Sequence, residues 1–176
     1  MNYFELEPEN NTFKTLSIQT TYQCQQTCAN CYLGDMLNND SIPDIDIVRF
    51  EQAIRQLPNR TDIRFIGAEP TMNNNLTKMI RIVRQSGHRP SLLTNGLKLR
   101  RGVYAKELKE SGLNLLGLSM NGGTNPELYQ LFDNGKYAKS KMIALDNCFK
   151  YKMLPHVNMI VDPSNIDEIP NLLEYI

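Results

Sequence analysis

The sequence predicts an α/β protein in which about five β-strands alternate with helices, (βα)5, around one parallel sheet. Short apolar runs with the period-two alternation of strands recur along the chain, and a stretch with helical apolar spacing follows each of them. This alternation implies parallel strands joined by right-handed crossovers. The chain has 176 residues, of which 41% are hydrophobic, and this suits one domain with its own core.

A loose arm and two β/α units are predicted in the N-terminal half. Residues 1–13 are polar and acidic, and we expect a single core domain over residues 14–176. Alternation predicts strands at about residues 14–20 and 63–66, the second ending at Gly67. Helices should follow both strands, because apolar side chains recur every three or four residues. These side chains are Ile47, Phe50, Ile54 and Leu57 in the first helix and Leu76, Met79, Ile80 and Val83 in the second.

Three more β/α units are predicted in the C-terminal half. Strands should cover about residues 91–94, 113–120 and 157–161. A weak helical pattern covers about residues 100–111, and Asn125-Pro126 combines an N-cap with a proline in the first turn of a short helix. Two further helices should follow, with Pro170 tolerated only in the first turn of the last one. Their expected buried faces carry Met142, Leu145 and Phe149 in one helix and Ile166, Ile169, Leu173 and Ile176 in the other.

The composition argues against several functional classes. Lys plus Arg total 19 and Asp plus Glu total 19, so the formal net charge is zero and the basic excess of a generic nucleic-acid binder is lacking. The opening residues lack the features of a signal peptide, and no run approaches the ~18 apolar residues of a membrane span. We therefore expect a cytoplasmic protein with no membrane and no specific nucleic-acid partner. A basic cluster that should form a solvated face comprises Lys136, Lys139, Lys141, Lys150 and Lys152.

Three of the four cysteines lie close together in the chain. Cys24, Cys28 and Cys31 form a C-x3-C-x2-C pattern in the long loop after the first predicted strand. Soft thiolate ligands favour zinc, copper(I) or an iron–sulfur cluster. A structural zinc site wants four ligands and a [4Fe–4S] cluster usually takes four cysteines, so three cysteines would leave one coordination position open. The fourth cysteine, Cys148, shares an apolar helix face and is expected to be a buried free thiol.

Polar and glycine-rich segments also follow the next three predicted strands. Parallel sheets bind ligands beyond the C-terminal ends of their strands, so these segments should face the cysteine loop. Gly67-Ala68-Glu69-Pro70-Thr71 follows the second strand, Asn95-Gly96 the third, and Ser119-Met120-Asn121-Gly122-Gly123 the fourth. His88 and His156 are expected at the opposite, N-terminal ends of their strands, with surface or capping roles.

Together these motifs resemble those of the radical S-adenosylmethionine (radical SAM) superfamily. The cysteine loop is similar to its C-x3-C-x2-C signature, Gly67-Ala68-Glu69-Pro70 to its G-G-E-P, Thr94-Asn95-Gly96 to its T-N-G, and Ser119-Met120-Asn121-Gly122 to its S-x-D-G. The resemblance runs from about residue 14 to the end. Its style is similar to the branch that includes the molybdenum-cofactor enzyme MoaA and many peptide maturases. It implies an open, partial TIM-like barrel, truncated relative to the usual (βα)6.

The resemblance implies a role for each motif. Cys24, Cys28 and Cys31 would hold a [4Fe–4S] cluster whose open iron chelates S-adenosylmethionine (SAM). An electron from a flavodoxin- or ferredoxin-like donor would cleave SAM, and the resulting 5′-deoxyadenosyl radical would abstract hydrogen from a peptide, protein or small-molecule substrate. The implied cofactor-binding residues are Gly67, Ala68, Glu69 and Pro70 at the methionine amino group, Ser119 and Asn121 at the ribose, Asn158 and Ile160 near the ribose or adenine, and Asn95 in the T-N-G loop.

The chain departs from the family pattern at several positions. Ala68 replaces a glycine, and Asn121 replaces an aspartate whose carboxylate would accept two ribose hydroxyl bonds. A lower affinity for SAM is therefore expected. Tyr32, directly after the last cysteine, fits either packing or cofactor contact. The basic residues after the T-N-G loop are expected to be a solvated helix start; they are Lys98, Arg100 and Arg101.

Other functions fit the same residues. One is an activating enzyme that places a glycyl radical on a partner protein, and another is a non-enzymatic binding module in which the cysteines hold zinc. A third is a member that binds SAM without radical chemistry. An exposed parallel edge is a pairing hazard, so we expect the sheet to be covered. The cover would be a second copy of the chain, a partner or substrate protein, or a C-terminal portion.

Overall fold

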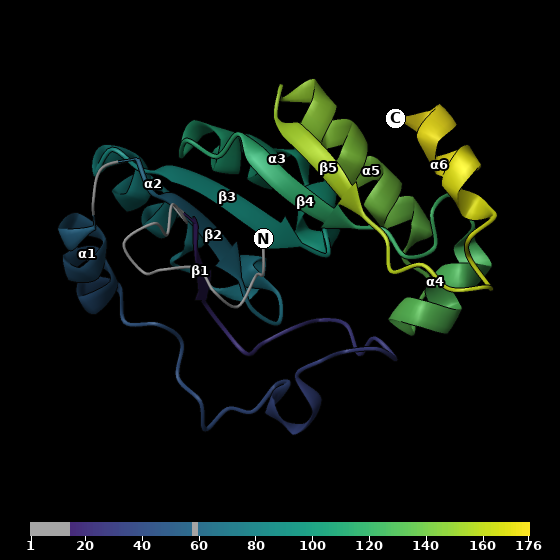
Figure 1. Ribbon diagram of the computed structural model, residues 1–176, viewed down its shortest axis with the longest axis horizontal. Helices are drawn as coiled ribbons and strands as arrows, with labels where there is room; N and C mark the ends of the chain where they lie inside the picture. Colours follow the sequence, from purple (N-terminus) through teal and green to yellow (C-terminus); the bar gives the residue numbers. More distant parts are fainter. Residues whose placement is uncertain (1–14, 58–59) are drawn as a thin grey trace, which may run out of the picture.

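The computed structural model describes residues 15–57 and 60–176, which form one parallel five-stranded sheet with helices (Figure 1). The expected N-terminal arm, residues 1–13, lies outside the described residues. The strands lie in chain order, and each pairs in parallel with the next. They are β1 (Thr15–Gln19), β2 (Asp62–Ile66), β3 (Arg89–Thr94), β4 (Leu115–Ser119) and β5 (Leu154–Asn158). The predicted open α/β fold of five parallel strands is confirmed.

Helices connect the strands, and four of them contact one another in chain order along one face of the sheet. These four are α1 (Ile47–Gln56), α2 (Leu76–Gln85), α3 (Gly102–Glu110) and α5 (Ala138–Lys150). In Figure 1 the long loop between β1 and α1 runs apart from this helical layer, below the sheet. The remaining helices are α4 (Pro126–Asp133), α6 (Glu168–Tyr175) and the 3-10 turns η2 (Gly34–Met36), η3 (Pro70–Met72) and η4 (Leu97–Arg100). Within the two described ranges, no helix is long and apolar enough to cross a membrane.

Side chains alternate between the two faces of the sheet. Ile63, Phe65 and Leu92 are fully buried beneath the helices, in the main hydrophobic core. Their neighbours in the strands point to the other side, because successive residues of a strand face opposite ways. We call this second side the open face; it carries Arg64, Ser91, Leu93, Leu115, Gly117 and His156. Within residues 15–57 and 60–176, one face of the parallel sheet is therefore available to a ligand.

The fifth strand begins earlier than the sequence pattern indicated. It covers Leu154–Asn158 and pairs with β4 from Leu115 to Ser119, whereas residues 157–161 were expected. Pro155 interrupts the apolar alternation, but an edge strand tolerates a proline because one side of its backbone need not donate to a neighbour. The shift places His156 in the middle of the strand and Ile160 beyond its end. The expectation that His156 begins the strand is therefore wrong.

The buried face of α5 also differs from the expected one. Phe149 is 43% exposed, and the fully buried side chains are Lys141, Ala144, Leu145 and Cys148. The burial of Cys148 was predicted correctly. The error arose because a lysine counts as polar in a periodicity pattern, whereas Lys141 is buried with an ionic partner. The expectation that Lys141 belongs to a solvated basic face is wrong.

The last helix is rotated relative to its expected face. Leu172 is 5% exposed and joins the core, whereas Leu173 is 67% exposed, and Ile166 and Ile176 are exposed as well. The carboxylate of Glu168 accepts hydrogen bonds from the backbone N–H and hydroxyl of Thr124, at 3.2 and 3.0 Å. This anchor turns Glu168 inward, and Leu172 follows one helical turn later on the same side. Pro170 lies in the first turn of α6, as expected.

The rotation of α6 gives a direct stability prediction. Leu172→Ala should lower the free energy of unfolding by about 2–3 kcal/mol, because it removes a buried side chain at the edge of the core. Leu173→Ala, its exposed neighbour, should change that free energy by less than about 0.5 kcal/mol. Urea denaturation followed by circular dichroism measures both. Equal effects, or a larger effect at Leu173, would contradict the observed rotation.

Candidate active site at the C-terminal ends of the strands

A cavity of about 640 Å³ opens where the strands end on the open face of the sheet. It brings together nearly all residues expected in the site, from loops that are far apart in the chain. Pro70 alone does not line the cavity, because it is buried as the first residue of η3. The predicted residues that line it are Cys24, Cys28, Cys31, Gly67, Ala68, Glu69, Asn95, Ser119, Asn121, Asn158 and Ile160.

The cysteine loop is held in place by side-chain amides. The backbone N–H of Cys24 donates to Asn38 Oδ1 at 2.8 Å, and Asn95 Nδ2 donates to the sulfur of Cys24 at 3.6 Å. The second bond joins the loop after β1 to the loop after β3. All three cysteines of the motif are half-buried free thiols. Their sulfurs are therefore shielded on one side and accessible from the cavity on the other.

Burial disfavours the charged forms of the Cys24 and Cys28 thiols. It raises the pKa of Cys24 to about 11. Burial likewise raises the pKa of Cys28 to about 12, with the negative charge of Asp133 as the second cause. Metal ligation requires thiolates, so a bound metal centre must displace these protons. The raised pKa values of Cys24 and Cys28 therefore favour their neutral thiols until a metal centre binds them.

Cys24, Cys28 and Cys31 supply the soft thiol donors that an iron–sulfur cluster takes. Across the described ranges, no three His, Cys, Asp or Glu side chains are placed so that they could share a single metal ion. In an iron–sulfur cluster the cysteine ligands bind through a multi-iron core, so their sulfurs need not meet at one ion. Cys24, Cys28 and Cys31 meet that weaker requirement, because they line one cavity on one loop. These thiols could hold a cluster, with a coordination position left free for a second ligand.

Glu69 joins the loops after β2 and β3. It is fully buried, and its carboxylate accepts hydrogen bonds from the N–H and hydroxyl of Thr71, the hydroxyl of Thr94 and the N–H of Asn95, at 2.6–3.0 Å. With every oxygen engaged inside the protein, Glu69 shapes the loops rather than presenting a free carboxylate. Because Asn95 also contacts Cys24, Glu69 stabilises the cysteine loop indirectly through Asn95.

The glycine of the Gly67-Ala68 pair is required where it stands. Gly67 has a φ of +150°, and a Cβ there would lie 2.7 Å from the carbonyl oxygen of Thr21. Ala68 is half-buried, lines the cavity and donates its N–H to the same carbonyl oxygen at 3.0 Å. The structure thus accommodates the alanine that departs from the family motif, whereas an alanine at the preceding position would collide with the backbone.

Asn121 is engaged on both sides of its amide. Its Nδ2 donates to Asp133 Oδ1 at 3.1 Å, and its Oδ1 accepts from the backbone N–H of Ile160 at 3.1 Å. One N–H and one lone pair remain for a ligand. An aspartate at this position would set two carboxylates against each other. The replacement of aspartate by Asn121 is therefore explained by the buried carboxylate of Asp133 behind it.

These motifs and their placement match a known protein family. A sequence model described as the radical SAM superfamily matches residues 18–176. The chain belongs to the radical SAM superfamily. Members of this superfamily use a [4Fe–4S] cluster and SAM, which agrees with a three-cysteine loop that faces a cavity.

Curated relatives within the superfamily act on different small molecules, according to their names. The chain is 29% identical over 167 residues to 7,8-dihydro-6-hydroxymethylpterin dimethyltransferase of Methanocaldococcus jannaschii, covering 90% of this chain and 32% of that protein. It is 25% identical over 174 residues to a probable GTP 3′,8-cyclase of Methanococcus aeolicus, covering 94% of this chain and 56% of that protein. The chain thus spans less than two thirds of the length of either relative.

Solved structures of radical SAM proteins share the fold. Native anSMEcpe with bound AdoMet and Kp18Cys peptide superimposes with a TM-score of 0.74 at 20% identity, covering 92% of this chain and 47% of that one. Streptococcus suis SuiB bound to precursor peptide SuiA gives a TM-score of 0.77 at 14% identity, covering 92% and 36%. At these identities the likeness concerns the fold of the core.

The structure of this radical SAM core contains site residues that sequence reasoning missed. Arg64 from β2 and His156 from β5 both line the cavity from the open face. A Cβ on Gly117, between them in the sheet, would meet His156 Nε2 at 2.7 Å and Asn158 Nδ2 at 2.6 Å. Glycine at this position therefore lets two polar side chains of β5 lie flat over β4. No sequence signal marked this, because it depends on the pairing of β4 with β5.

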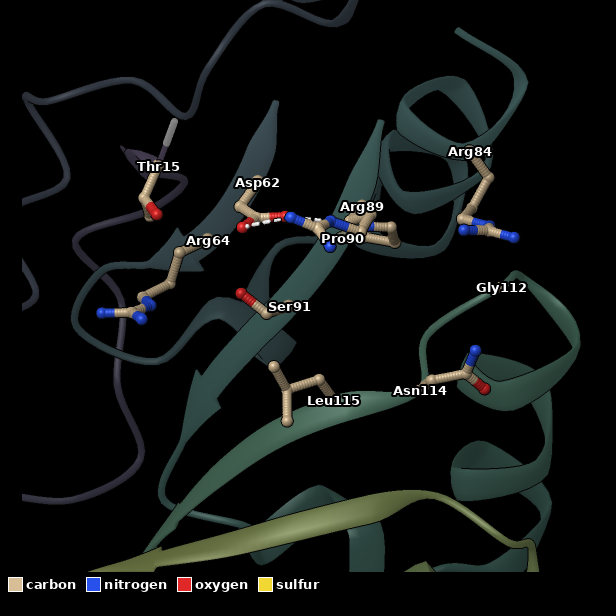
Figure 2. Close-up of a pocket in the computed structure, with 10 residues that line it drawn as sticks. All are labelled: Thr15, Asp62, Arg64, Arg84, Arg89, Pro90, Ser91, Gly112, Asn114 and Leu115. Carbon is tan, nitrogen blue, oxygen red and sulfur yellow. Dashed lines mark hydrogen bonds and ion pairs between the residues drawn. The ribbon is translucent and has the colours of Figure 1, made fainter. Parts of the chain in front are cut away.

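A smaller cavity of about 270 Å³ lies at the other end of the open face. It shares Arg64, Ser91 and Leu115 with the larger one, so the two adjoin along the sheet. Figure 2 shows the paired Asp62 and Arg89 in its middle, with Arg64 and Arg84 on opposite sides. Arg89 donates to Asp62 Oδ2 at 2.9 Å across the β2–β3 pair. This contact joins two neighbouring strands, so it gives Arg89 a structural role in the sheet.

The structure also places His88, Lys98 and Tyr32. His88 is buried, accepts from the N–H of Thr61 at Nδ1 (3.3 Å) and faces the carbonyl of Ile54 with Nε2 (3.1 Å), which fits its expected capping role. Lys98 is not a solvated helix start, because its Nζ donates to the carbonyl of Thr71 at 2.6 Å. Tyr32 is 73% exposed on the rim of the cavity, so it does not serve as core packing.

The position of Asn121 gives a second prediction. Asn121→Asp would restore the family aspartate, yet it should lower the free energy of unfolding by about 1–3 kcal/mol, because the donor to Asp133 becomes a second acceptor. SAM should bind no more tightly than to the unchanged protein. Combining Asn121→Asp with Asp133→Asn should recover part of the lost stability, since a donor then faces an acceptor again. Thermal unfolding and calorimetry measure both quantities, and a fully stable Asn121→Asp protein would contradict the observed contact.

Proposed function

We propose that this chain is the core of a radical SAM enzyme, with Cys24, Cys28 and Cys31 as ligands of a [4Fe–4S] cluster and SAM bound beside it. The observation that carries the proposal is the convergence of the cysteine loop and the motifs after β2, β3, β4 and β5 on one cavity. When bound, the reduced cluster supplies the electron that splits SAM into methionine and a 5′-deoxyadenosyl radical. A flavodoxin- or ferredoxin-like protein is the proposed electron donor.

The residues of the chain bind and orient SAM. The backbone around Gly67 and Ala68 lies at the cavity wall and would receive the methionine amino group. Ser119 and the free N–H and lone pair of Asn121 would hold the ribose hydroxyls, with Asn158 and Ile160 near the ribose or adenine. Pro70 and Glu69 act from behind by fixing the turn of η3.

The substrate would lie on the open face, where the two cavities adjoin. Arg64, Ser91 and His156 are polar side chains that it would meet there. Two curated relatives are named for pterin and GTP chemistry, and two structural neighbours hold peptides. The proposal is therefore hydrogen abstraction from a small molecule or a peptide, and the identity of that molecule is open to a substrate screen.

An anaerobic assay tests the proposed function. The protein is reconstituted with iron and sulfide, reduced with dithionite and incubated with SAM, and 5′-deoxyadenosine and methionine are quantified. We expect iron and sulfide in equal amounts, and both products. Zinc without sulfide would favour a metal-stabilised binding module instead, and a cluster with bound SAM but no 5′-deoxyadenosine would favour a member without radical chemistry.

We also propose that another segment or protein covers the exposed β5 edge of the sheet. In the described ranges β5 pairs only with β4, and Leu154 on this strand is 66% exposed. A second copy, a partner or substrate protein, or a C-terminal portion of a longer chain would cover it. Light scattering during turnover distinguishes these covers. A strict monomer that couples 5′-deoxyadenosine tightly to product without any partner would show that five units close the site alone.

A further inference from the structure

A buried ion pair lies behind the wall of the cavity. Asp133 is the last residue of α4 and Lys141 lies in the first turn of α5, with Lys141 Nζ 2.6 Å from Asp133 Oδ2. Their side chains are only 1% and 2% exposed. Lys141 also donates to the carbonyl of Ser119 at 2.7 Å and lies 5.3 Å from the centre of the Tyr129 ring. Neither charge reaches the cavity surface itself.

One side of the pair contacts the cysteine loop. Gln26 Nε2 donates to Asp133 Oδ2 at 3.4 Å, and the thiol of Cys28 lies 3.8 Å from Asp133 Oδ1. The backbone next to Asp133 supports the same loop, because the N–H of Ala29 donates to the carbonyl of Phe132 at 3.0 Å. The end of α4 is therefore the surface against which the middle of the cysteine motif rests.

The other side of the pair contacts the residues proposed to hold the ribose. Asn121 donates to Asp133, and the Ser119 carbonyl accepts from Lys141. A single ion pair thus contacts a cluster ligand and both ribose residues. The cysteine loop follows β1 and the ribose residues follow β4, and two strands separate β1 from β4 in the sheet, so the pair joins segments that the sheet itself does not bring together.

Stability alone does not account for this pair. Removing two charges from water costs several kcal/mol per ion, and a well-packed apolar pair of similar size is often as stable or more stable. A thiolate bound to iron has no proton to donate, so Asp133 beside it would rely on Lys141, Asn121 and Gln26 for its hydrogen bonds. Groups that hydrogen-bond to metal ligands orient those ligands and adjust the properties of the metal.

We propose that the Asp133–Lys141 pair is a positioning unit that holds Cys28 and the ribose residues in one arrangement and sets the net charge next to the cluster. This inference rests on the proposed function. The net charge around an iron–sulfur cluster is one of the factors that set its reduction potential, and charges act strongly in a buried, low-dielectric setting. The neutral pair gives the cluster hydrogen-bonded support without adding net charge.

The charge argument predicts opposite signs for two nearly isosteric variants. Lys141→Met leaves the negative charge of Asp133 next to a cluster that must accept an electron, so its midpoint potential should become more negative. Asp133→Asn leaves the positive charge of Lys141, so the potential should become more positive. The double variant restores neutrality and should return towards the unchanged protein. Lys141→Arg keeps the charge and should shift the potential less than Lys141→Met.

The experiment is a redox titration of reconstituted proteins, followed by the electron paramagnetic resonance signal of the reduced cluster. Lys139→Met is the matched control, because Lys139 is an exposed lysine on the same helix and its loss should leave the potential unchanged. Calorimetric titration with SAM adds a second readout. Both single variants should bind SAM several-fold more weakly, since Ser119 and Asn121 lose their support. Circular dichroism of the unloaded proteins reports folding.

Defined results overturn the inference. Shifts of the same sign in both single variants, or shifts no larger than that of Lys139→Met, would show that the pair does not set the charge at the cluster. If Lys141→Met does not fold, Asp133→Asn is compared with the double variant, and an unchanged potential between them has the same meaning. These failures differ from failure of the proposed function, in which the unchanged protein would assemble no cluster or release no 5′-deoxyadenosine.

Discussion

Replacing Cys24, Cys28 and Cys31 together by alanine is expected to abolish iron and sulfide binding and all cleavage of SAM. These are the cysteines that line the cavity, and Cys148 is fully buried in the hydrophobic core. Each of the three should be needed, because a [4Fe–4S] cluster held by three cysteines has no spare protein ligand. Iron and sulfide analysis after anaerobic reconstitution, together with the visible absorption of the cluster, measures the loss.

Cys148→Ala is the matched control for this experiment. Cys148 belongs to the hydrophobic core on α5, and burial raises its pKa to about 12, so it stays a neutral thiol. Its replacement should leave iron and sulfide contents unchanged and cost only a little stability through the small cavity it creates. Loss of the cluster in Cys148→Ala, or a full cluster in any single replacement within the loop, would contradict the assignment of the three ligands.

The parts of the fold that local patterns govern could be predicted from the sequence. Strands β2 and β3 and helices α1 and α2 follow from apolar spacing, because each buries one regular face against the next layer. Their loops carry the site, and the rule that ligands bind at the C-terminal strand ends placed the cysteines opposite Gly67, Asn95 and Ser119. Those residues indeed line one cavity.

The missed features all depend on contacts between different elements of the fold. Lys141 reads as a surface residue until Asp133 is known to face it, and the start of β5 follows from its register with β4 rather than from apolar spacing. Asn121 illustrates the same limit: as a departure from a motif it suggested weaker SAM binding, whereas the structure shows that its amide matches a buried carboxylate. Apolar spacing and motifs describe single helices, strands or loops, whereas these three features depend on contacts between two such elements.

Glu69→Ala is expected to have the second large effect, on folding and on the site together. The substitution leaves the buried donors of Thr71, Thr94 and Asn95 without an acceptor. Hydrogen bonds to a charged group are worth about 1.5–3 kcal/mol each, although losses within one network do not simply add. We expect the free energy of unfolding to fall by about 3–5 kcal/mol, which for a chain of this length lowers Tm by roughly 6–20 °C.

Glu69→Gln separates the charge and acceptor pattern from the size of the side chain. A glutamine has nearly the same shape, but whichever way its amide turns, an NH2 group faces donors from Asn95 or from Thr71 and Thr94. Its loss of stability should lie between that of Glu69→Ala and that of Glu107→Gln, an exposed control on α3 that should change the free energy of unfolding by less than about 0.5 kcal/mol. SAM affinity and cluster content should fall in the same order, because Asn95 carries the constraint from Glu69 to Cys24. Thermal unfolding and calorimetry test this order, and a Glu69→Gln protein with unchanged Tm and SAM affinity would show that the carboxylate does not organise these loops.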